Sequence, residues 1–497
     1  MVGSRRVVIV GAGIGGLATA LRLRRHGFPV TVVEKQPRPG GRSNVLHEAG
    51  FRVDTGPTIL VMKDTFQELY RSLGLRLEDR LRLVQLEPNY RIHFHDGTSL
   101  DLSGNMARLS EEVERVAPGS APRLFHFLGE AARKYALGMP FVDRNYDRIT
   151  DLVKPLAGLR LLRTNAHHSL YRQVSAYFGD EDKLAKAFSF HSMFLGLSPM
   201  DALAMYSMIT YADLAGGMWY PMGGVYSIVE DLVKLADEAG VEVRTSVPVA
   251  EIRVEGGRAA GVTLESGEFL PAEVVVSNAD LPYTYRQLIA REHRPDYPDA
   301  RLDRMQYACS GFVLYLGLDT VYPHLSHQGL FFAQDYRANL DAIFRHKTLP
   351  ADPSFHMCVP TITDPSLAPA GHSLIYLLAP MPNLSGCVDW DTAAPVVRRQ
   401  LLARLEQIVH PDIARHIVWE RHYLPTDWRR DVNATLGTAF GSLAQGFLQS
   451  AYFRPHNRSR HVRGLYFVGQ GTYPGIGMPM VVISSRLVTE RVVADYA

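Results

Sequence analysis

The feature that most constrains the fold is a glycine-rich turn near the N-terminus, which lies between two apolar runs. Residues 6–10 (RVVIV) have the β-branched composition of a buried parallel strand. Gly11, Gly13 and Gly16 then form the spacing G-x-G-x-x-G, and the residues after them have the apolar spacing of a helix. A second strand, residues 29–35 (PVTVVEK), follows. This order of strand, glycine turn, helix and strand predicts a dinucleotide-binding α/β unit.

Each part of this unit has a physical task in holding a dinucleotide. Gly11 permits the tight turn, Gly13 lets a pyrophosphate approach the backbone, and Gly16 lets the helix pack on the strand. The helix N-terminus faces the negative charge of the phosphates. Glu34, near the end of the second strand, can accept hydrogen bonds from the adenosine ribose. We therefore expect the cofactor to be bound by Gly11, Gly13, Ile14, Gly15, Gly16 and Glu34.

The residues after Glu34 favour FAD over NAD. An NAD-binding unit would pass directly into another βαβ crossover, whereas residues 35–60 stay irregular and rich in glycine. Gly40, Gly41 and Arg42 can bring the chain back to the pyrophosphate and offer a cationic donor. Together these features resemble the flavoprotein family that includes amine oxidases and carotenoid desaturases. The resemblance implies noncovalent FAD, with further contacts from Lys35, Gly56, Pro57, Thr58 and Val247, although simple packing is an alternative for Val247.

Composition narrows the class of protein further. At 497 residues the chain exceeds what one hydrophobic core usually supports, which predicts two domains. A formal net charge of +2 with no long basic run argues against nucleic-acid binding. The three cysteines are not paired at metal-ligand or C-x-x-C spacing, so we expect no metal site and no disulfide framework. No apolar run reaches the roughly 18 residues of a spanning helix, which indicates a protein that is soluble or lies on a membrane surface.

The nucleotide-binding elements return after long excursions. Residues 220–280 have the pattern of a glycine turn, an amphipathic helix and several strands, which suits the edge of that domain. We therefore predict an α/β fold with a Rossmann-like FAD-binding domain of the amine-oxidase type and a discontinuous α+β substrate domain. The first domain is assigned residues 1–105, 217–280 and 426–497. The second, for substrate binding and membrane contact, is assigned residues 106–216 and 281–425.

Three stretches of the last part of the chain are distinctive. They are residues 363–384 (TDPSLAPAGHSLIYLLAPMPNL), 449–459 (QSAYFRPHNRS) and 464–479 (GLYFVGQGTYPGIGMP). With them, the chain resembles the bacterial-type phytoene desaturase family of carotenoid desaturases over essentially its full length. The resemblance implies an FAD enzyme that introduces double bonds into a long acyclic isoprenoid by hydride transfer to flavin. A C30 diapophytoene desaturase, an acyclic xanthophyll 3,4-desaturase and a terminal-methyl oxygenase share these motifs and stay open as alternatives.

The second glycine-rich stretch, residues 469–479, is expected to complete the cofactor site. By resemblance, Gly469 and Gly471 let the backbone pass beside FAD. The last helix then begins with its N-terminus aimed at the flavin ring, where a positive helix end favours the charge of the reduced ring. Relatives usually have His where this chain has Tyr473, which makes Tyr473 a candidate on the substrate side. The residues expected to start the helix are Gly475, Ile476, Gly477, Met478 and Pro479.

Few polar residues are candidates for the reaction itself. The resemblance offers Asp151 and Lys154 for proton handling, where some relatives carry Asp and Arg; an exposed helical ion pair is the alternative. Residues 151–173 mix leucines with basic side chains, as an interfacial helix or a solvated one would. His191 is a candidate for the substrate cavity, and a hydrogen-bonded core histidine is equally consistent. His93 and His95 fit one face of a hairpin strand better than a metal site.

The resemblance also implies the partners and the location of the protein. The expected partners are a long-chain isoprenoid or carotenoid substrate and a membrane surface, which the protein binds peripherally on the cytoplasmic face. An oligomer is compatible with the sequence. A flavin amine oxidase remains the alternative from another reaction class, although no cysteine follows Cys387 to attach a flavin covalently. A noncatalytic flavin-binding scaffold conflicts with the retention of the whole set of cofactor motifs.

Overall fold

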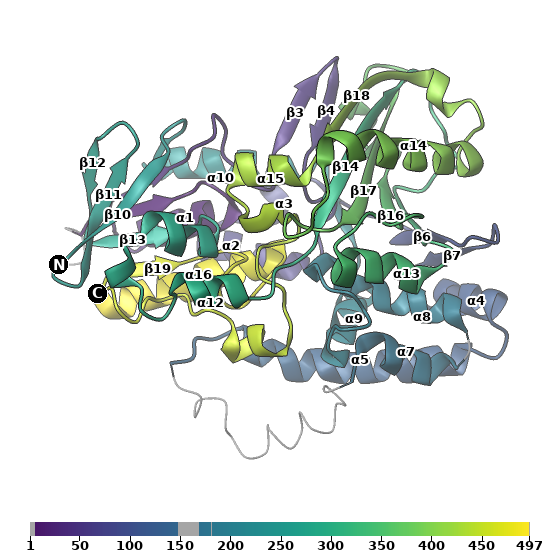
Figure 1. The fold of residues 1–497 in the computed structure, drawn as a ribbon, viewed down its shortest axis with the longest axis horizontal. Helices are drawn as coiled ribbons and strands as arrows, with labels where there is room; N and C mark the ends of the chain where they lie inside the picture. Colours follow the sequence, from purple (N-terminus) through teal and green to yellow (C-terminus); the bar gives the residue numbers. More distant parts are fainter. Residues whose placement is uncertain (1–4, 148–167, 180, 497) are drawn as a thin grey trace.

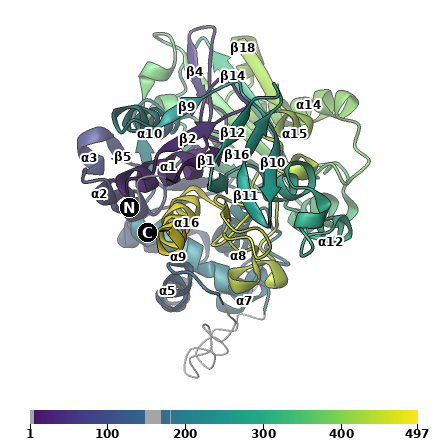
Figure 2. The same cartoon turned by 90° about the vertical axis from the view of Figure 1, so that its left-hand side faces the viewer.

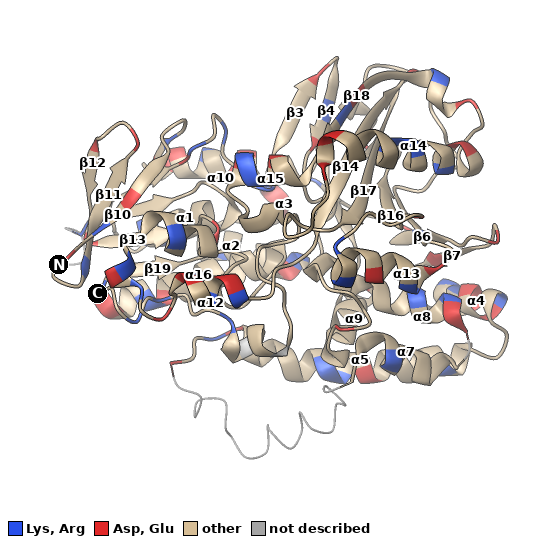
Figure 3. Cartoon of the chain, in the orientation of Figure 1, with Lys and Arg blue, Asp and Glu red and all other residues tan. Residues whose placement is uncertain are grey.

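The computed structural model describes residues 5–147, 168–179 and 181–496, which are arranged around two main β-sheets (Figure 1). The two ends of the chain lie close together, beside the smaller of these sheets. Charged side chains of both signs are interspersed along the chain (Figure 3). Within the described ranges, no helix combines the length and the hydropathy needed to cross a bilayer.

The first sheet is built from segments that are far apart in the sequence. Its five strands are all parallel, and the central strand β1 pairs with β13 on one side and with β2 on the other. The N-terminal strand and the strand before the C-terminal glycine loop therefore belong to one sheet, which confirms the Rossmann-like part of the predicted fold. The order of the strands is β19 (Leu465–Phe467), β13 (Val274–Ser277), β1 (Val7–Val10), β2 (Val30–Val33) and β9 (Glu242–Arg244).

Side chains of β1 alternate between two apolar layers, as expected for a strand that is covered on both faces. Val7 and Ile9 pack with helices on one face, and Val8 and Val10 pack with an antiparallel sheet on the other (Figure 2). The helices are α1 (Ile14–Arg25), α10 (Tyr226–Glu238) and α16 (Met478–Tyr496). The antiparallel strands are β10 (Val249–Glu255), β11 (Arg258–Leu264) and β12 (Phe269–Pro271).

The second sheet has seven strands, and neighbouring strands are antiparallel except for β15 and β6. Helix α14 (Trp390–Ile408) covers one face and packs against Phe312 and Leu314. The side chains that alternate with these along the strand, such as Val313, lie on the other face of the sheet. There they pack in an apolar cluster that includes β4 (Phe51–Asp54). The order of the strands is β18 (Ile417–Tyr423), β14 (Ser310–Leu318), β17 (Ser373–Met381), β16 (Phe355–Cys358), β15 (Gln328–Phe331), β6 (Tyr90–His93) and β7 (Ser99–Leu102).

Strand pairing and packing show which sheet two segments near the predicted domain boundaries join. The hairpin β6–β7 was expected in the FAD domain, within residues 1–105. One edge of β6 pairs with β7, and its other edge pairs with β15 of the second sheet. The hairpin itself is as predicted, and the His93 ring stacks on Phe331 with 4.5 Å between ring centroids. Residues 281–302 were expected in the substrate domain. They pack on the first sheet instead, where Leu281 and Leu302 join the apolar cluster of Val8 and Val10.

The described part of the first insertion, residues 106–216, is helical as predicted. Its helices share an apolar cluster with β6 and β7 that is rich in aromatic side chains. They are α4 (Met106–Val116), α5 (Ala121–Val142), α7 (Leu170–Phe178), α8 (Asp182–Ser189) and α9 (Ser207–Gly216). Shorter elements elsewhere are β3 (Val45–Glu48), α2 (Lys63–Ser72), α3 (Leu77–Arg80), β5 (Leu83–Gln85), β8 (Trp219–Pro221), α11 (Leu281–Tyr283), α12 (Asp299–Arg304), α13 (Tyr336–Asp341) and α15 (Pro425–Val432).

Candidate functional site

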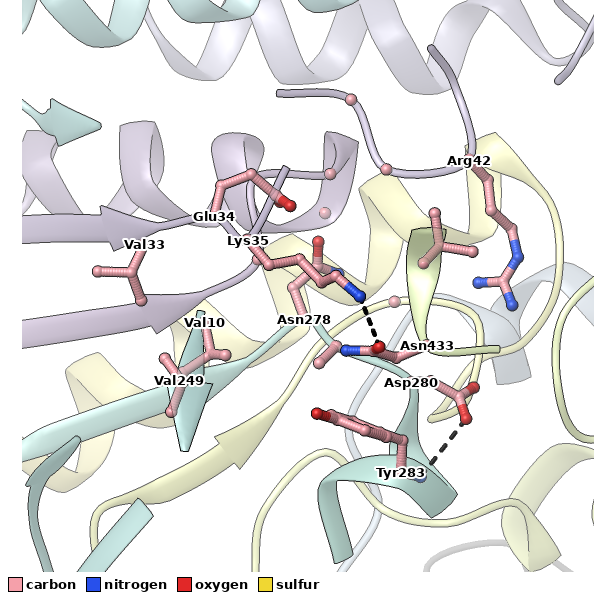
Figure 4. A pocket seen from close by; sticks show the side chains of 18 of the residues that line it. Val10, Val33, Glu34, Lys35, Arg42, Val249, Asn278, Asp280, Tyr283 and Asn433 are labelled. Atoms are coloured by element: carbon pink, nitrogen blue, oxygen red, sulfur yellow. Dashed lines mark hydrogen bonds between the residues drawn. The ribbon is translucent and has the colours of Figure 1, made fainter. Parts of the chain in front are cut away.

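A cavity lies at the carboxyl ends of β1, β2 and β13, where the two glycine-rich stretches of the chain meet (Figure 4). Open α/β sheets bind ligands in the crevice at this edge. Gly16, which does not line the cavity, lies behind it: a Cβ on Gly16 would come within 2.1 Å of the Gly11 carbonyl oxygen, so only glycine allows this approach of helix and strand. The predicted residues that line the cavity are Gly11, Gly13, Ile14, Gly15, Glu34, Lys35, Gly40, Gly41, Arg42, Val247, Gly469 and Met478.

Glu34 stands at the end of β2 with its carboxylate held by the backbone. One oxygen accepts a hydrogen bond from the Ala12 amide at 2.8 Å, and the other accepts one from the Gln36 amide at 2.9 Å. Burial raises the pKa of Glu34 above its ordinary value, while these two donors act to lower it. Each oxygen retains a lone pair, so the carboxylate is oriented and can still accept hydrogen bonds from a ribose.

Helix α1 presents an uncapped N-terminus to the same cavity. Gly13 is its N-cap residue and provides no side-chain acceptor, and the first turn contains no acidic residue. The free backbone N–H groups and the positive end of the helix dipole are therefore available to an anion.

Arg42 supplies a half-buried cation further along the cavity. Its Nε has no hydrogen-bond partner among the described residues, and its Nη2 lies 3.5 Å from the Thr438 carbonyl oxygen. Asp280 lies on the opposite wall (Figure 4). It accepts hydrogen bonds from Thr435 Oγ1 at 2.5 Å and from Ser442. Burial lowers the pKa of Arg42 and raises that of Asp280, and their mutual attraction opposes both shifts. A guanidinium N–H that is buried and lacks a partner, like the Nε of Arg42, fits a phosphate oxygen.

Asn278 is a site residue that the sequence did not reveal. Its Nδ2 donates a hydrogen bond to the Val468 carbonyl oxygen at 3.0 Å, directly before the second glycine loop. A Cβ on Gly13 would come within 2.8 Å of Asn278 Oδ1, and one on Gly469 within 2.8 Å of its Nδ2. Asn278 therefore lies between the two glycine loops and contacts both. The available signal was its position directly after a buried parallel strand, where ligand-binding residues collect.

The C-terminal end of α15 and the residue after it, Asn433, close another side of the cavity and were also missed. Lys35 Nζ donates hydrogen bonds to Asn433 Oδ1 at 2.7 Å and to the Arg430 carbonyl oxygen at 2.8 Å (Figure 4). Burial lowers the pKa of Lys35. Residues 431–433 join the cavity wall through this contact, which links the C-terminal part of the chain to the strand that carries Glu34.

Several predicted cofactor residues lie outside the cavity wall. Gly56, followed by Pro57 and Thr58, passes behind Arg42: a Cβ on Gly56 would be 1.9 Å from the Arg42 carbonyl oxygen. Gly471 packs on Leu281. The backbone N–H of Ile476 donates to Gln445 Oε1 at 2.9 Å. The loop thus supports the cavity, and the chain reaches the wall again at Met478, the first residue of α16. The other predicted residues of this stretch that do not line the cavity are Gly475, Gly477 and Pro479.

The candidates for the substrate side are buried and hydrogen-bonded. The Tyr473 hydroxyl donates to the Phe141 carbonyl oxygen, and the ring packs edge-on against Tyr146 with 6.0 Å between centroids. His191 is fully buried, with Nε2 at 3.0 Å from Asp213 Oδ2. Neither residue lines the cavity described above, and their roles toward a substrate stay predictions. The proposed proton-handling pair, Asp151 and Lys154, falls outside the described residues.

The groups that do converge fit a dinucleotide of the FAD type. The oriented carboxylate of Glu34 suits the adenosine ribose. The α1 N-terminus and the unpaired Nε of Arg42 suit a pyrophosphate. The positive end of α16, at Met478, faces the remaining part of the cavity.

Known proteins share this sequence and architecture. A family model described as flavin containing amine oxidoreductase matches residues 14–493. The chain is 42% identical to the zeta-carotene-forming phytoene desaturase of Myxococcus xanthus, over 98% of this chain and 93% of that protein. It is 38% identical to the all-trans-zeta-carotene desaturase of the same organism, over 98% of this chain and 93% of that protein. A solved oxidoreductase from Methanosarcina mazei has the same fold, with a TM-score of 0.65, 19% identity, and coverage of 98% of this chain and 100% of that one.

Proposed function

Because the chain belongs to the family of flavin-containing amine oxidoreductases, we propose that it is a carotenoid desaturase that introduces double bonds into a long acyclic isoprenoid. Family membership makes it an FAD-dependent oxidoreductase. The observation that carries the narrower function is full-length similarity, at 42% and 38% identity, to two Myxococcus xanthus enzymes named for phytoene and zeta-carotene desaturation. Of these two enzymes, the one named for phytoene has the higher identity to this chain, and we therefore propose a phytoene-type substrate.

The residues of the cavity would position FAD rather than react with the substrate. When bound, FAD supplies the acceptor for a hydride taken from a saturated carbon of the hydrocarbon. Glu34 holds the ribose end, and the α1 N-terminus with Arg42 holds the pyrophosphate. Asn278 keeps the two glycine loops at a fixed separation, which would help to hold the cofactor in one orientation between them.

Turnover of defined hydrocarbons by the purified holoenzyme tests this proposal. We expect anaerobic bleaching of the flavin by phytoene in liposomes, and products with longer conjugated systems when an electron acceptor is present. Products are separated by chromatography and identified by their absorption spectra. Zeta-carotene, diapophytoene and a hydroxylated acyclic carotenoid are assayed in parallel. No new chromophore from any of these substrates would contradict the desaturase function.

The same assay separates the alternatives. Preference for diapophytoene over phytoene would indicate a C30 enzyme, and preference for the hydroxylated substrate would indicate a xanthophyll 3,4-desaturase. Incorporation of oxygen into a terminal methyl group would indicate an oxygenase. Flavin bleaching by primary amines, with none by hydrocarbons, would indicate an amine oxidase.

Peripheral binding to the cytoplasmic face of a membrane is part of the proposal, because a C40 hydrocarbon partitions into lipid. Two neighbouring helical turns, Phe447–Gln449 and Ala451–Phe453, support it. Leu448 is 72% exposed and Phe453 is 48% exposed, whereas most large apolar side chains of the described residues are buried. Exposed apolar side chains at one place favour contact with lipid.

A further inference from the structure

Arg454 is a buried cation that lacks a carboxylate partner among the described residues. Its side chain is 1% exposed. The other described arginines that are buried each pair with a carboxylate: Arg22 with Glu68, Arg294 with Asp299, and Arg491 with Asp147. Arg454 is the exception, and an isolated buried charge is expensive unless something compensates for it.

Backbone carbonyl oxygens from three segments surround this guanidinium. Nε donates to the Thr472 carbonyl oxygen at 3.1 Å, and Nη1 donates to that of Gln449 at 3.2 Å. Nη2 donates to the carbonyl oxygens of Leu443, at 3.4 Å, and Gln470. These dipoles accept from four of the five N–H donors, but they carry no net negative charge. Burial lowers the pKa of Arg454 to about 10, so the side chain remains a cation at neutral pH.

The guanidinium lies one residue behind the wall of the dinucleotide cavity. Gln470, whose carbonyl oxygen it binds, lines that cavity. Gln470 and Thr472 belong to the loop that leads to Met478, where the positive end of α16 also faces the cavity. Asp280, the carboxylate on this side, is already bonded to Thr435 and Ser442 and faces Arg42. Among the described residues, no carboxylate on this side of the cavity forms an ion pair with Arg454.

We propose that Arg454 is an electrostatic positioning residue that stabilises the negative charge on reduced FAD. A hydride carries two electrons and one proton to the flavin, so the ring gains one unit of negative charge, which resides on its pyrimidine part. The neighbouring carbon of the substrate loses a proton to a base, and the new double bond forms. Arg454 does not touch the reacting atoms. Its charge acts through the short distance and low dielectric behind the cavity wall. This inference depends on FAD and not on the carotenoid substrate.

Two substitutions of Arg454 separate its charge from its hydrogen bonds. Arg454→Met removes the cation, and Arg454→Lys keeps it while losing the planar fork. We expect Arg454→Met to lower the equilibrium constant for two-electron flavin reduction at least tenfold, which is about 30 mV. Binding of sulfite, which adds to the oxidised flavin and leaves the same negative charge on the ring, should weaken at least tenfold. Arg454→Lys should stay within about threefold of wild type at pH 7, although both variants lose thermal stability.

Arg491→Met is the matched control. Arg491 is also buried, on α16, and pairs with Asp147. It lies about 20 Å along the helix from Met478, at 1.5 Å per residue. This variant should lose thermal stability and keep the sulfite affinity and potential of wild type.

A purely structural clamp would give a different result. It predicts lower thermal stability with unchanged potential and sulfite affinity in Arg454→Met, which would overturn the inference. An equal loss of sulfite affinity in the Lys and Met variants at pH 7 would also overturn it. If Arg454→Met does not retain FAD, Arg454→Lys provides the test: its sulfite affinity should fall relative to wild type between pH 7 and 10, as the buried lysine loses its proton. A constant ratio over that range would contradict the role. No carotenoid enters these measurements, so they are independent of the proposed substrate.

Discussion

Asn278 shows how one side chain can connect the two ends of a chain. It follows β13, which lies between β1 and β19 in the sheet, so its side chain reaches the turns after both neighbours. Its amide donates to the Val468 carbonyl oxygen, while its oxygen lies against the turn of Gly13. A residue at this position must donate on one side and must be small enough for glycines to surround it. Asparagine meets both requirements, and aspartate meets only the second.

Asn278→Asp should therefore destabilise the protein although the shape of the side chain is unchanged. The substitution replaces the Nδ2–H donor with a carboxylate oxygen that faces a carbonyl oxygen, and it adds a negative charge beside the expected phosphates. We expect the free energy of unfolding to fall by about 1–3 kcal/mol and the FAD affinity of the apoprotein to fall at least tenfold. Urea titration and flavin fluorescence measure the two effects.

The matched control is Asn105→Asp, the same chemical change at the N-cap of α4. There the side chain only accepts, from the Ala107 and Arg108 amides, and aspartate is an equally good N-cap. Unfolding free energy and FAD affinity should both stay close to wild type. Equal behaviour of Asn278→Asp and Asn105→Asp would show that the donated hydrogen bond has no role.

Glu34 and Asn278 also show what the sequence could predict about the site. Glu34 lies within the same βαβ unit as the glycines, so a local pattern placed it at the cavity. Asn278 and Asn433 reach the cavity only because distant segments return to the same sheet edge. No local periodicity contains that information. Residues within one supersecondary unit were predictable, and residues brought in by long-range pairing were not.

Helix α10 depends on a half-buried carboxylate from another element. Asp54, at the end of β4, accepts hydrogen bonds from the Val225 and Tyr226 amides at 2.6 and 2.9 Å. The same turn positions the Tyr226 hydroxyl, which donates to the Pro39 carbonyl oxygen beside Gly40 and Gly41. The start of α10 thereby supports the loop that carries Arg42. Burial outweighs the two donors and raises the pKa of Asp54 from 3.8 to about 6.

This shift predicts the sign of a pH effect on stability. Because the native state binds the proton more tightly than the unfolded state, Asp54 favours the native state most below pH 4, and this contribution is lost as the pH rises from about 4 to about 6. The full change is at most about 3 kcal/mol. In Asp54→Asn the loss should be absent, so the stability of the variant relative to wild type should rise over that interval. Urea unfolding at a series of pH values, with excess FAD, measures the difference.

Asp96→Asn provides a control of opposite sign. Hydrogen bonds from Lys183 and Thr98 lower the pKa of Asp96, so its contribution is present above the unfolded pKa and lost as the pH falls. Relative to wild type, that variant should become less stable as the pH rises toward 4, and the difference should stay nearly constant from there to pH 6. A flat or falling difference curve for Asp54→Asn between pH 4 and 6 would contradict the role given to Asp54.

Individual strands and helices were easier to predict than the neighbours with which they pair or pack. The alternating pattern of residues 90–102 correctly indicated a hairpin, but it did not reveal which sheet the hairpin joins. The pattern states which residues of a strand face a core and leaves open which edge the strand joins. β6 joins β15, more than 230 residues later in the chain, and only the completed second sheet makes that edge available. The domain ranges assigned from the sequence could not take this pairing into account.

At the scale of the whole molecule, the chain alternates between a cofactor sheet and a second sheet with a helical layer beneath it (Figure 1). The turns that carry Leu448 and Phe453 follow the second sheet and precede β19. Tyr452, between them, packs with Met139 and Phe141 of α5, so these turns are anchored to the helical layer. An anchored turn holds its exposed apolar side chains in a fixed place at the surface, as a contact with lipid requires.

Replacing both side chains with serine should weaken binding to vesicles and leave the cofactor site intact. Each substitution removes about 1–2 kcal/mol of favourable transfer free energy, because each side chain can bury only part of its surface in lipid. Leu448→Ser combined with Phe453→Ser should therefore lower the partition constant more than tenfold. Co-sedimentation with phosphatidylcholine vesicles, with and without phosphatidylglycerol, measures the partition constant.

The matched control combines Val321→Ser and Val418→Ser. These substitutions remove apolar side chains that are 47% and 54% exposed from the region of the second sheet. FAD content and activity on detergent-dispersed substrate should match wild type in both double variants. Equal vesicle binding by the two double variants would mean that the turns are not the site of attachment, because a general loss of surface hydrophobicity affects both in the same way.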